Sequence, residues 1–420
     1  MREMKDSGVQ WIGAIPVDWK IDNPKYHFTQ RKDRAKPGMV QLTASQKYGV
    51  ITQTEYMERT GANIVTVEKD FDILKLVRAG DFVIHMRSFQ GGLEYSEKTG
   101  STSSAYVMLI PHSTICEPRY YKWFFKSSNY IDALSSTSNL VRDGQAMRWA
   151  NFIQLPIPFP PASEQRRIAD FLDTKCAEID ALTADIQTQI DTLEQYKRSI
   201  ITETVTKGLN PDAEMKDSGV FYMAPMNASW HLTKIGYICT KLSRSFVPED
   251  TALICSNKGK VQVRADDLTG IMVSEDNAMQ GIRAGDIAIH GMDTWHGAIA
   301  LSEFDGKITR VVHVCDSTED KRFIVYYMQH LAFQGVYKLI SNGVRGNTSD
   351  FRSWDKVRDI WIAIPKTRQE QKAICDYLDR QCNAVEEVIS TKKQQLEVLA
   401  DYKKSLIFEY VTGKKEVPLS

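Results

Sequence analysis

Two short stretches carry residue types used in nucleic-acid chemistry, but neither has the spacing that the chemistry needs. Residues 23–26, Asn-Pro-Lys-Tyr, are close to the Asn/Asp-Pro-Pro-aromatic loop with which base methyltransferases hold a flipped base. Lys25 replaces the second proline, and no glycine-rich strand–helix element for S-adenosylmethionine accompanies it. A turn is therefore the better interpretation of this stretch.

Residues 211–216, Pro-Asp-Ala-Glu-Met-Lys, contain the carboxylates and lysine of a nuclease metal site. Such a site needs carboxylates on separate strands, whereas here they are crowded into one linker. The chain also has no Gly-x-x-x-x-Gly-Lys-Ser/Thr phosphate-binding loop. We expect no catalytic residue and no metal site in this chain.

A different set of polar residues suits the reading of base edges. Arginine pairs with guanine, glutamine or asparagine with adenine, and aspartate can accept from cytosine. Some of these residues come shortly after the two Gly-Asp runs, and the others come shortly before Trp149 and Trp354. The members of the set are Arg87, Ser88, Gln90, Arg142, Gln145 and Arg148, then His290, Asp293, His296, Arg345 and Asn347. The alternative for each is a solvated loop side chain, and His290 matches His85 at a position where a structural role fits equally well.

An internal repeat positions these residues. The matched segments are residues 4–9 with 215–220, Trp19 with Trp230, 79–81 with 284–286, and 164–173 with 370–379. Their offsets are 211, 211, 205 and 206 residues. Because the matches stay in order with only small gaps, the chain consists of two similar halves.

The first part of each half is predicted to be mixed α/β. Residues 80–85 and 105–110 are short β-rich runs, and residues 118–127 suit a short amphipathic helix. Residues 155–161, Leu-Pro-Ile-Pro-Phe-Pro-Pro, can form only an edge strand or an extended exit segment. The aromatic rows at 120–125 and 323–327 are interpreted as core.

The second part of each half is predicted to be one long helix, because residues 163–207 contain neither glycine nor proline. A heptad seam runs through Leu172, Ile179, Ile186, Leu193 and Ile200, with Leu182, Ile190 and Tyr196 between them. The second seam contains Leu378, Val385, Lys392, Leu399 and Leu406, flanked by Ile389, Leu396 and Tyr402. Thr367 and Glu370 form a capping box at its start. Such a helix is on the order of 65 Å long.

Two such helices in one chain can bury their seams against each other as an antiparallel pair. A coil between two copies of the chain is the alternative. A spacer of this length would suit two domains that read half-sites about one DNA turn apart, roughly 34–36 Å. Two different α/β domains, called heads from here on, would read an asymmetric target that is split by unread bases.

Composition narrows the class of protein. The net charge is zero, with +4 over residues 1–160 and −1 over residues 210–366, so we expect weak DNA binding by the chain alone and phosphate affinity from partners. The seven scattered cysteines contain no Cys-x-x-Cys pair, which favours free thiols. The chain has no long apolar run and no signal-like start, so we expect a cytoplasmic location and no membrane contact.

These motifs resemble the specificity subunits of Type I restriction–modification systems. The resemblance rests on residues 4–9, Gly80-Asp81, residues 155–161, 164–173 and 196–208, most of them with second copies, and it covers essentially the whole chain. It implies an α+β fold with a pseudo-twofold repeat, in which two α/β target-recognition domains are separated by two long paired helices. The boundaries that we predict are 1–160 and 210–366 for the recognition domains, and 161–209 and 367–420 for the helical spacers.

The resemblance also implies a non-catalytic subunit that binds double-stranded DNA, two adenine methyltransferase subunits and two restriction subunits. S-adenosylmethionine, ATP and Mg²⁺ would then be bound by the partners, and no cofactor by this chain. Two rival hypotheses are a stand-alone methyltransferase or nuclease, and a coiled-coil adaptor without a role on DNA. Activity of the purified chain would favour the first rival, and a mobility shift with and without the methyltransferase would separate the second.

Overall fold

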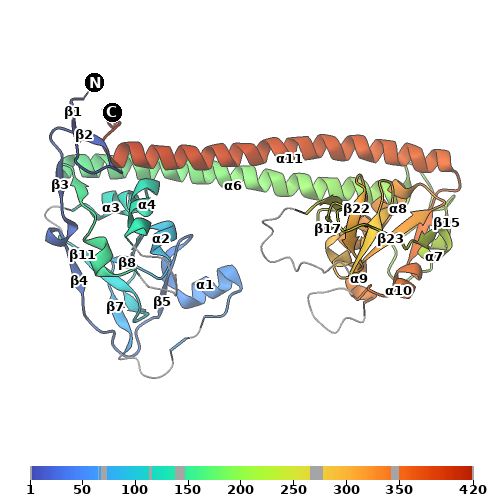
Figure 1. Ribbon diagram of the computed structural model, residues 1–420, viewed down its shortest axis with the longest axis horizontal. Helices are drawn as coiled ribbons and strands as arrows, with labels where there is room; N and C mark the ends of the chain where they lie inside the picture. Colours follow the sequence, from blue (N-terminus) through green and yellow to red (C-terminus); the bar gives the residue numbers. More distant parts are fainter. Residues whose placement is uncertain are drawn as a thin grey trace. The chain divides into compact units, whose positions relative to one another are not determined.

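The computed structural model describes residues 2–64, 66–67, 73–112, 116–137, 147–264, 278–341 and 350–418. The chain divides into two units: unit 1 contains residues 1–186 and 393–420, and unit 2 contains residues 187–392. Each unit holds one α/β half and a stretch of both long helices, α6 (Ala162–Lys207) and α11 (Arg368–Val411) (Figure 1). Both helices begin one residue after the predicted spacer starts. The boundaries between the two units fall inside both long helices. Our predicted division into four segments instead separates the helices from the α/β domains, and it stays a prediction.

Unit 1 is built around an antiparallel sheet with the strand order β4-β11-β8-β9. These strands are β4 (Phe28–Arg31), β11 (Val107–Pro111), β8 (Phe82–Ile84) and β9 (Glu94–Tyr95). Two-stranded sheets join β1 (Met4–Asp6) to β2 (Ala14–Pro16), β3 (Lys20–Asp22) to β12 (Ile157–Phe159), β5 (Leu42–Ser45) to β6 (Gly49–Thr52), and β7 (Lys75–Val77) to β10 (Gly100–Thr102). The helices are η1 (Pro24–Tyr26), α1 (Gln53–Thr60), α2 (Ser88–Gly91), α3 (Pro118–Phe124), α4 (Ser128–Ser136) and α5 (Trp149–Phe152).

Unit 2 repeats this plan strand for strand. Its central sheet has the order β16 (Cys239–Lys241), β23 (Val312–Ser317), β20 (Ile287–His290) and β21 (Ile299–Leu301). The two-stranded sheets join β13 (Met215–Lys216) to β14 (Met226–Asn227), β15 (His231–Lys234) to β24 (Trp361–Ile364), β17 (Leu253–Ser256) to β18 (Lys260–Val263), and β19 (Met279–Ile282) to β22 (Gly306–Thr309). The helices are α7 (Ile235–Ile238), η4 (Thr294–His296), α8 (Lys321–Phe333), α9 (Val336–Leu339) and α10 (Trp354–Arg358). The sequence repeat is therefore a structural repeat.

The predicted elements of the heads are confirmed. The two β-rich runs form β8 and β11, residues 118–124 form α3, and the proline-rich exit segment pairs as β12 in a two-stranded sheet. The aromatic rows lie in the core, where Tyr120, Tyr121, Phe124 and Phe125 are fully buried in unit 1, and Phe323 and Tyr327 are buried in unit 2. Edge-to-face contacts, such as 5.5 Å between the rings of Phe28 and Tyr121, fix their geometry.

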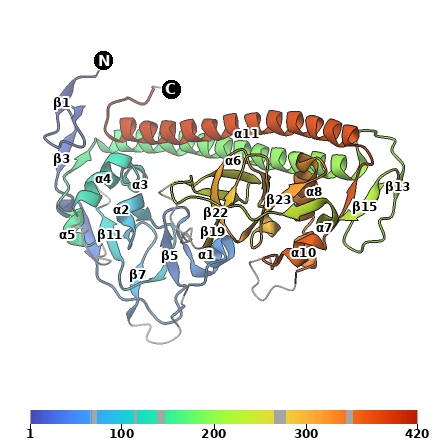
Figure 2. The same ribbon diagram turned by 45° about the vertical axis from the view of Figure 1, so that its right-hand side comes forward.

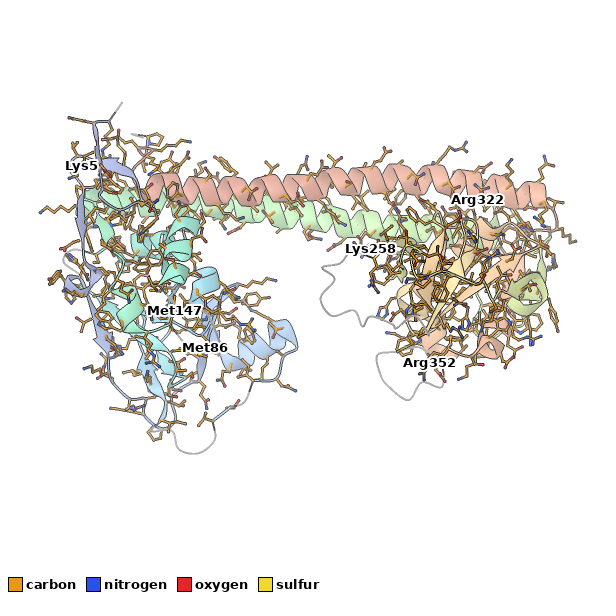
Figure 3. The ribbon with its side chains drawn as sticks, in the orientation of Figure 1. Lys5, Met86, Met147, Lys258, Arg322 and Arg352 are labelled. Atoms are coloured by element: carbon orange, nitrogen blue, oxygen red, sulfur yellow. The ribbon has the colours of Figure 1, made fainter. Side chains whose placement is uncertain are left out.

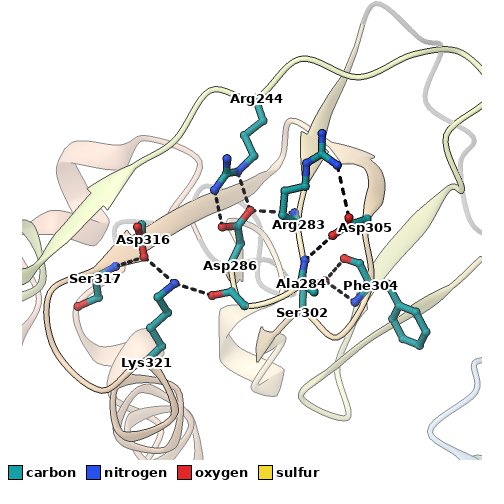
Figure 4. A network of polar contacts seen from close by, with 11 residues as sticks. Arg244, Arg283, Ala284, Asp286, Ser302, Phe304, Asp305, Asp316, Ser317 and Lys321 are labelled. Atoms are coloured by element: carbon teal, nitrogen blue, oxygen red, sulfur yellow. Dashed lines mark hydrogen bonds and ion pairs between the residues drawn. The ribbon is translucent and has the colours of Figure 1, made fainter.

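The Gly-Asp motif closes the turn before each central strand. Asp81 accepts a 2.8 Å hydrogen bond from the backbone N–H of Arg78, and two at 2.7 and 2.8 Å from the Arg31 guanidinium. Asp286 is bonded in the same way to Arg283 and Arg244 (Figure 4). Both carboxylates are almost fully buried, and an unpaired charge there would be costly, so each arginine ties its strand to the turn.

The Glu-Gln motif joins each head to the helix that follows it. In unit 1, Gln165 accepts from the backbone N–H of Glu117 and donates to the carbonyl of Pro160, both at 2.8 Å. In unit 2, Gln371 makes the same two bonds with Asp320 and Pro365, at 2.9 and 3.1 Å. Because a glutamine amide both donates and accepts, one side chain fixes the start of the long helix to both neighbouring segments.

The two long helices lie side by side and antiparallel (Figures 1 and 2). In unit 1, the first part of α6 packs on the last part of α11, with the rings of Phe171 and Tyr410 4.4 Å apart and Lys403 Nζ 2.6 Å from Asp180. In unit 2 the opposite ends pair, with Lys197 Nζ 2.5 Å from Glu386. The predicted intramolecular pair is confirmed.

Most of the predicted seam residues are buried or half-buried, whereas three of the residues predicted beside the seam are exposed. Leu172, Ile179, Ile186, Leu378, Val385 and Leu406 are buried, and Leu193, Ile200 and Leu399 are half-buried. Leu182, Tyr196 and Tyr402 are instead 47%, 54% and 54% exposed. Each of them lies one residue before a position of the second row of the seam, which recurs every seven residues from Cys176 and from Cys382, and therefore falls on the flank of the pair. The second row of the seam runs through Cys176, Ile190, Cys382 and Ile389, all of which are buried.

The predicted capping box is only half formed. The Thr367 hydroxyl accepts a 3.2 Å hydrogen bond from the backbone N–H of Glu370, as expected of a cap. The Glu370 carboxylate does not return to Thr367, because it accepts a 2.9 Å hydrogen bond from the indole of Trp230. A contact between residues far apart in sequence thus replaces the local one.

Candidate nucleic-acid interface

The turn after β8 carries the first group of predicted base-reading residues. Arg87 and Gln90 are exposed there, and the backbone carbonyl of Arg87 accepts a 2.9 Å hydrogen bond from Gln46. Ser88 corrects our prediction, because its side chain is 0% exposed and its hydroxyl accepts from the backbone N–H of His85. Ser88 therefore closes the turn, and Arg87 and Gln90 project from it.

The second group in unit 1 lies before α5. Arg142 and Gln145 lie outside the described residues. Arg148 is exposed, and its backbone N–H donates a 3.0 Å hydrogen bond to Asn151 at the start of α5. Asn151 also donates to the carbonyl of Thr137, so it links the segments on either side of residues 138–146.

In unit 2, the corresponding turn after β20 brings three predicted residues together. His290 Nδ1 accepts hydrogen bonds from the backbone N–H groups of Met292 at 3.3 Å and Asp293 at 3.1 Å. Burial lowers the pKa of His290, while the Asp293 charge opposes that shift, and a ring nitrogen that accepts two such bonds is unprotonated. Asp293 Oδ1 lies 4.0 Å from the exposed His296 ring, so Asp293 and His296 are the accessible members of the group.

The last two predicted residues, Arg345 and Asn347, lie outside the described residues. The chain that follows them, however, is bonded to the same turn. The backbone N–H of Phe351 donates a 2.9 Å hydrogen bond to the carbonyl of Gly291, and His313 Nε2 lies 2.7 Å from the carbonyl of Phe351. Figure 3 shows Arg352 on the side of this domain away from the helices and Arg322 beside α11. The turn after β20 and the segment at Phe351 therefore meet at one edge of the domain.

Sequence reasoning missed the two arginine–aspartate pairs and the cations around them. Arg31 and Arg244 are 213 residues apart, whereas the aspartates that they bind are 205 apart, so the alignment of the halves did not match them. Lys241 and Arg310 were also missed, because neither belongs to a repeated motif. Lys241 lies near Arg310 because β16 pairs with β23 and Arg310 is in the turn that leads into β23.

We also examined the described residues for metal-binding groups, reactive thiols and membrane-spanning helices. They contain no group of three or more histidine, cysteine or acidic side chains that could hold a metal ion. All seven cysteines are free and buried, and burial raises the pKa of the Cys255 thiol to about 12, which keeps it protonated. No described helix is long and apolar enough to span a bilayer.

Two copies of one α/β domain, together with an antiparallel pair of long helices, define a class of internally repeated proteins. Comparison with known proteins specifies the class. Residues 20–192 match the family described as the Type I restriction modification DNA specificity domain. The chain is 20% identical, over 96% of its length and 94% of the relative's, to the Type I restriction enzyme MjaVIII specificity subunit of Methanocaldococcus jannaschii.

Two further comparisons agree. Over 28% of this chain and 24% of the relative, the sequence is 28% identical to the Type I restriction enzyme StySPI specificity subunit of Salmonella potsdam. A solved structure from work on complex assembly and conformational transition of the type I R-M system shares the fold, with a TM-score of 0.66 at 13% identity over 96% of this chain and 99% of that one. Residues 20–192 therefore match the Type I restriction modification DNA specificity domain, and over nearly its whole length the chain is similar to Type I restriction enzyme specificity subunits.

Proposed function

We propose that each α/β domain reads one half of an asymmetric bipartite DNA target. The observation that carries this proposal is one scaffold with two different recognition turns. The Gly-Asp turn and its arginine partner are the same in both units, whereas the accessible residues that follow are Arg87 and Gln90 in one unit and the half-buried Asp293 and the exposed His296 in the other. Side chains of these types favour different bases.

The helix pair would set the distance between the half-sites. Helix α6 has 46 residues and α11 has 44, which corresponds to about 66–69 Å of helix. Interhelical contacts in each unit fix the register of the pair, among them Lys403–Asp180 in unit 1 and Lys197–Glu386 in unit 2. Lys197 and Lys403 are 206 residues apart, as are Asp180 and Glu386, so the two ion pairs are copies of each other.

The flank of the helix pair offers two equivalent surfaces for partners. Leu182 of α6 and Tyr402 of α11 are exposed in unit 1, and their counterparts 206 residues away, Val388 and Tyr196, are exposed in unit 2. The heptad register places each pair on the same flank. Two copies of one apolar surface suit two identical partner subunits, which we assign to the adenine methyltransferase. The two restriction subunits would then join this assembly.

The chain itself is proposed to be non-catalytic, with S-adenosylmethionine, ATP and Mg²⁺ bound by the partner subunits. Calorimetric titration of the isolated chain with S-adenosylmethionine and with ATP tests this directly. We expect no binding of either, and stoichiometric micromolar binding would favour the stand-alone enzyme.

Methylome sequencing of a host with and without this gene tests the whole proposal. We expect a split, asymmetric adenine-methylated motif only when the gene is present. Exchanging residues 1–160 for the head of another family member should change one half of the motif and leave the other half and the spacing unchanged. A change in both halves would contradict independent reading, and an unchanged methylome with a stable protein would favour the adaptor.

A further inference from the structure

Unit 2 contains a polar hollow of about 690 Å³ on the edge of its central sheet. It lies where the segment after β16 passes β19 and the β22–β23 turn, and an isolated bridge between Arg244 and Gly281 joins these segments. Its lining combines polar and cationic residues, Lys241, Ser243, Arg244, Ser245, Gln280 and Arg310, with the apolar residues Leu242, Phe246 and Met279.

The cations of this hollow differ in how far they are neutralised. Arg244 is hydrogen-bonded to the buried Asp286, so its charge is neutralised within the domain. The Nε–H of Arg310 donates a 2.9 Å hydrogen bond to the carbonyl of Met279, and among the described residues its terminal nitrogens have no hydrogen-bond or ion-pair partner. Lys241 is exposed and has no hydrogen-bond or ion-pair partner within the part of the chain that the structure describes. The hollow thus holds two available positive charges in a unit whose sequence segment has a net charge of −1.

The other half of the repeat lacks both charges. Lys241 pairs across the sheet with Cys315, which pairs with Ile287, the residue after the Gly-Asp motif. In unit 1 the residue after the Gly-Asp motif is Phe82, which pairs with Leu109, and Leu109 pairs with Gln30. Gln30 is therefore the unit 1 counterpart of Lys241. Counting along the matched strands in the same way places Ser104 where unit 2 has Arg310. The two cations are therefore specific to unit 2.

We propose that this hollow binds a phosphate group of the DNA backbone through Lys241 and Arg310, with the Ser243 and Ser245 hydroxyls as further donors. The proposal rests on the proposed function, since it names the surface with which the second recognition domain contacts its half-site. A phosphodiester suits the site because cations and hydroxyl donors supply charge and hydrogen bonds without reading sequence. The contact would position the domain on the duplex and add to its affinity.

The test uses the complex of the full chain with its methyltransferase partner and a duplex carrying the methylated motif. Affinity is measured over a range of salt concentrations for the wild type, Lys241→Gln, Arg310→Gln and the double variant. Lys241→Gln places in unit 2 the side chain that unit 1 has at this position. Lys372→Gln, at an exposed lysine of α11, is the matched control for loss of one charge. Thermal unfolding checks that each variant is folded. If Arg310→Gln does not fold, the salt dependence of Lys241→Gln by itself tests the proposal.

Each single variant should reduce the slope of log K against log salt by about 0.9, and the double variant by about twice that, while the methylated sequence stays the same. An unchanged slope for folded Lys241→Gln, with a specific wild-type complex, would overturn the phosphate contact but leave the proposed function intact. A wild-type complex without sequence-specific binding would instead contradict the proposed function. If inorganic phosphate binds calorimetrically and Lys241→Gln abolishes only that binding, the hollow serves a free anion and the proposal is wrong.

Discussion

The indole nitrogen of Trp19 donates a 2.9 Å hydrogen bond to Glu164, 145 residues further along the chain in the first turn of α6. Both side chains are buried, and Arg2 also contacts this carboxylate. Gly413, just beyond α11, lies next to the Cη2 edge of the same indole. Trp230, Glu370 and Gly208 repeat this arrangement in unit 2. Each head is therefore held where one long helix begins and the other ends.

Replacing Glu164 should weaken this junction. Glu164→Ala leaves the buried indole N–H and the Arg2 guanidinium without their acceptor, so we expect a loss of about 2 kcal/mol in the free energy of unfolding. Urea unfolding monitored by tryptophan fluorescence measures it. Glu194→Ala, at an exposed position of the same helix, is the control and should change stability by less than about 0.5 kcal/mol. Equal stability of the two variants would mean that the junction contributes nothing.

Acid should destabilise unit 2 through His330. Burial lowers its pKa to about 4, and its Nδ1 lies 3.1 Å from the Thr202 hydroxyl of α6. The unfolded chain, with a histidine pKa near 6.5, takes up a proton before the folded chain does. The contribution of neutral His330 is therefore complete above about pH 6.5 and is lost as the pH falls toward 4, amounting to roughly 2 kcal/mol between pH 7 and 5. Urea unfolding at both pH values should show a smaller difference for His330→Gln, and the same difference would contradict this role.

A charge in the seam should break the helix pair. Ile186 is buried between the helices, and Ile186→Asp would bury a carboxylate at a cost of roughly 3 kcal/mol or more. We expect lower stability and weaker assembly with the methyltransferase, measured by calorimetry and by size-exclusion chromatography of the mixture. Ala181→Asp introduces the same charge at an exposed position of the same helix and should leave both properties near wild type.

Lengthening the helix pair should lengthen the unread part of the DNA target. Lys403–Asp180 and Lys392–Gln189 show that Asp185 lies opposite Glu397, so we insert four residues after each. The insertion adds about 6 Å and turns the helix about 40° beyond one full turn, a stutter that local unwinding can absorb. Since a base pair rises about 3.4 Å, methylome sequencing should show one to two more unread base pairs and unchanged half-sites. A four-residue insertion after Asn210, outside the helices, is the control. An unchanged spacing with full activity in the helix variant would show that the helices do not measure this distance.

The sequence alone determined the repeat, the long helices and most of the buried seam. These features are periodic or recur at a fixed offset, and a heptad is a local consequence of 3.6 residues per helical turn. Leu172, Ile179 and Leu378 were therefore placed in the seam without any knowledge of the fold, and all three are buried. The same pattern misassigned Leu182 and Tyr196, because hydrophobicity does not say on which side of a neighbouring helix a residue one position away will lie.

The tertiary structure decided which side chains remain available for recognition. Ser88 and Gln90 are two residues apart in one turn, yet one is buried against a backbone amide and the other is exposed. Glu370 has a local capping partner available but binds Trp230, 140 residues earlier in the chain. Lys241 and Arg310 line one hollow only because β16 pairs with β23 and Arg310 lies in the turn that leads into β23. Such contacts follow from long-range strand pairing and burial, which leave no local period in the sequence.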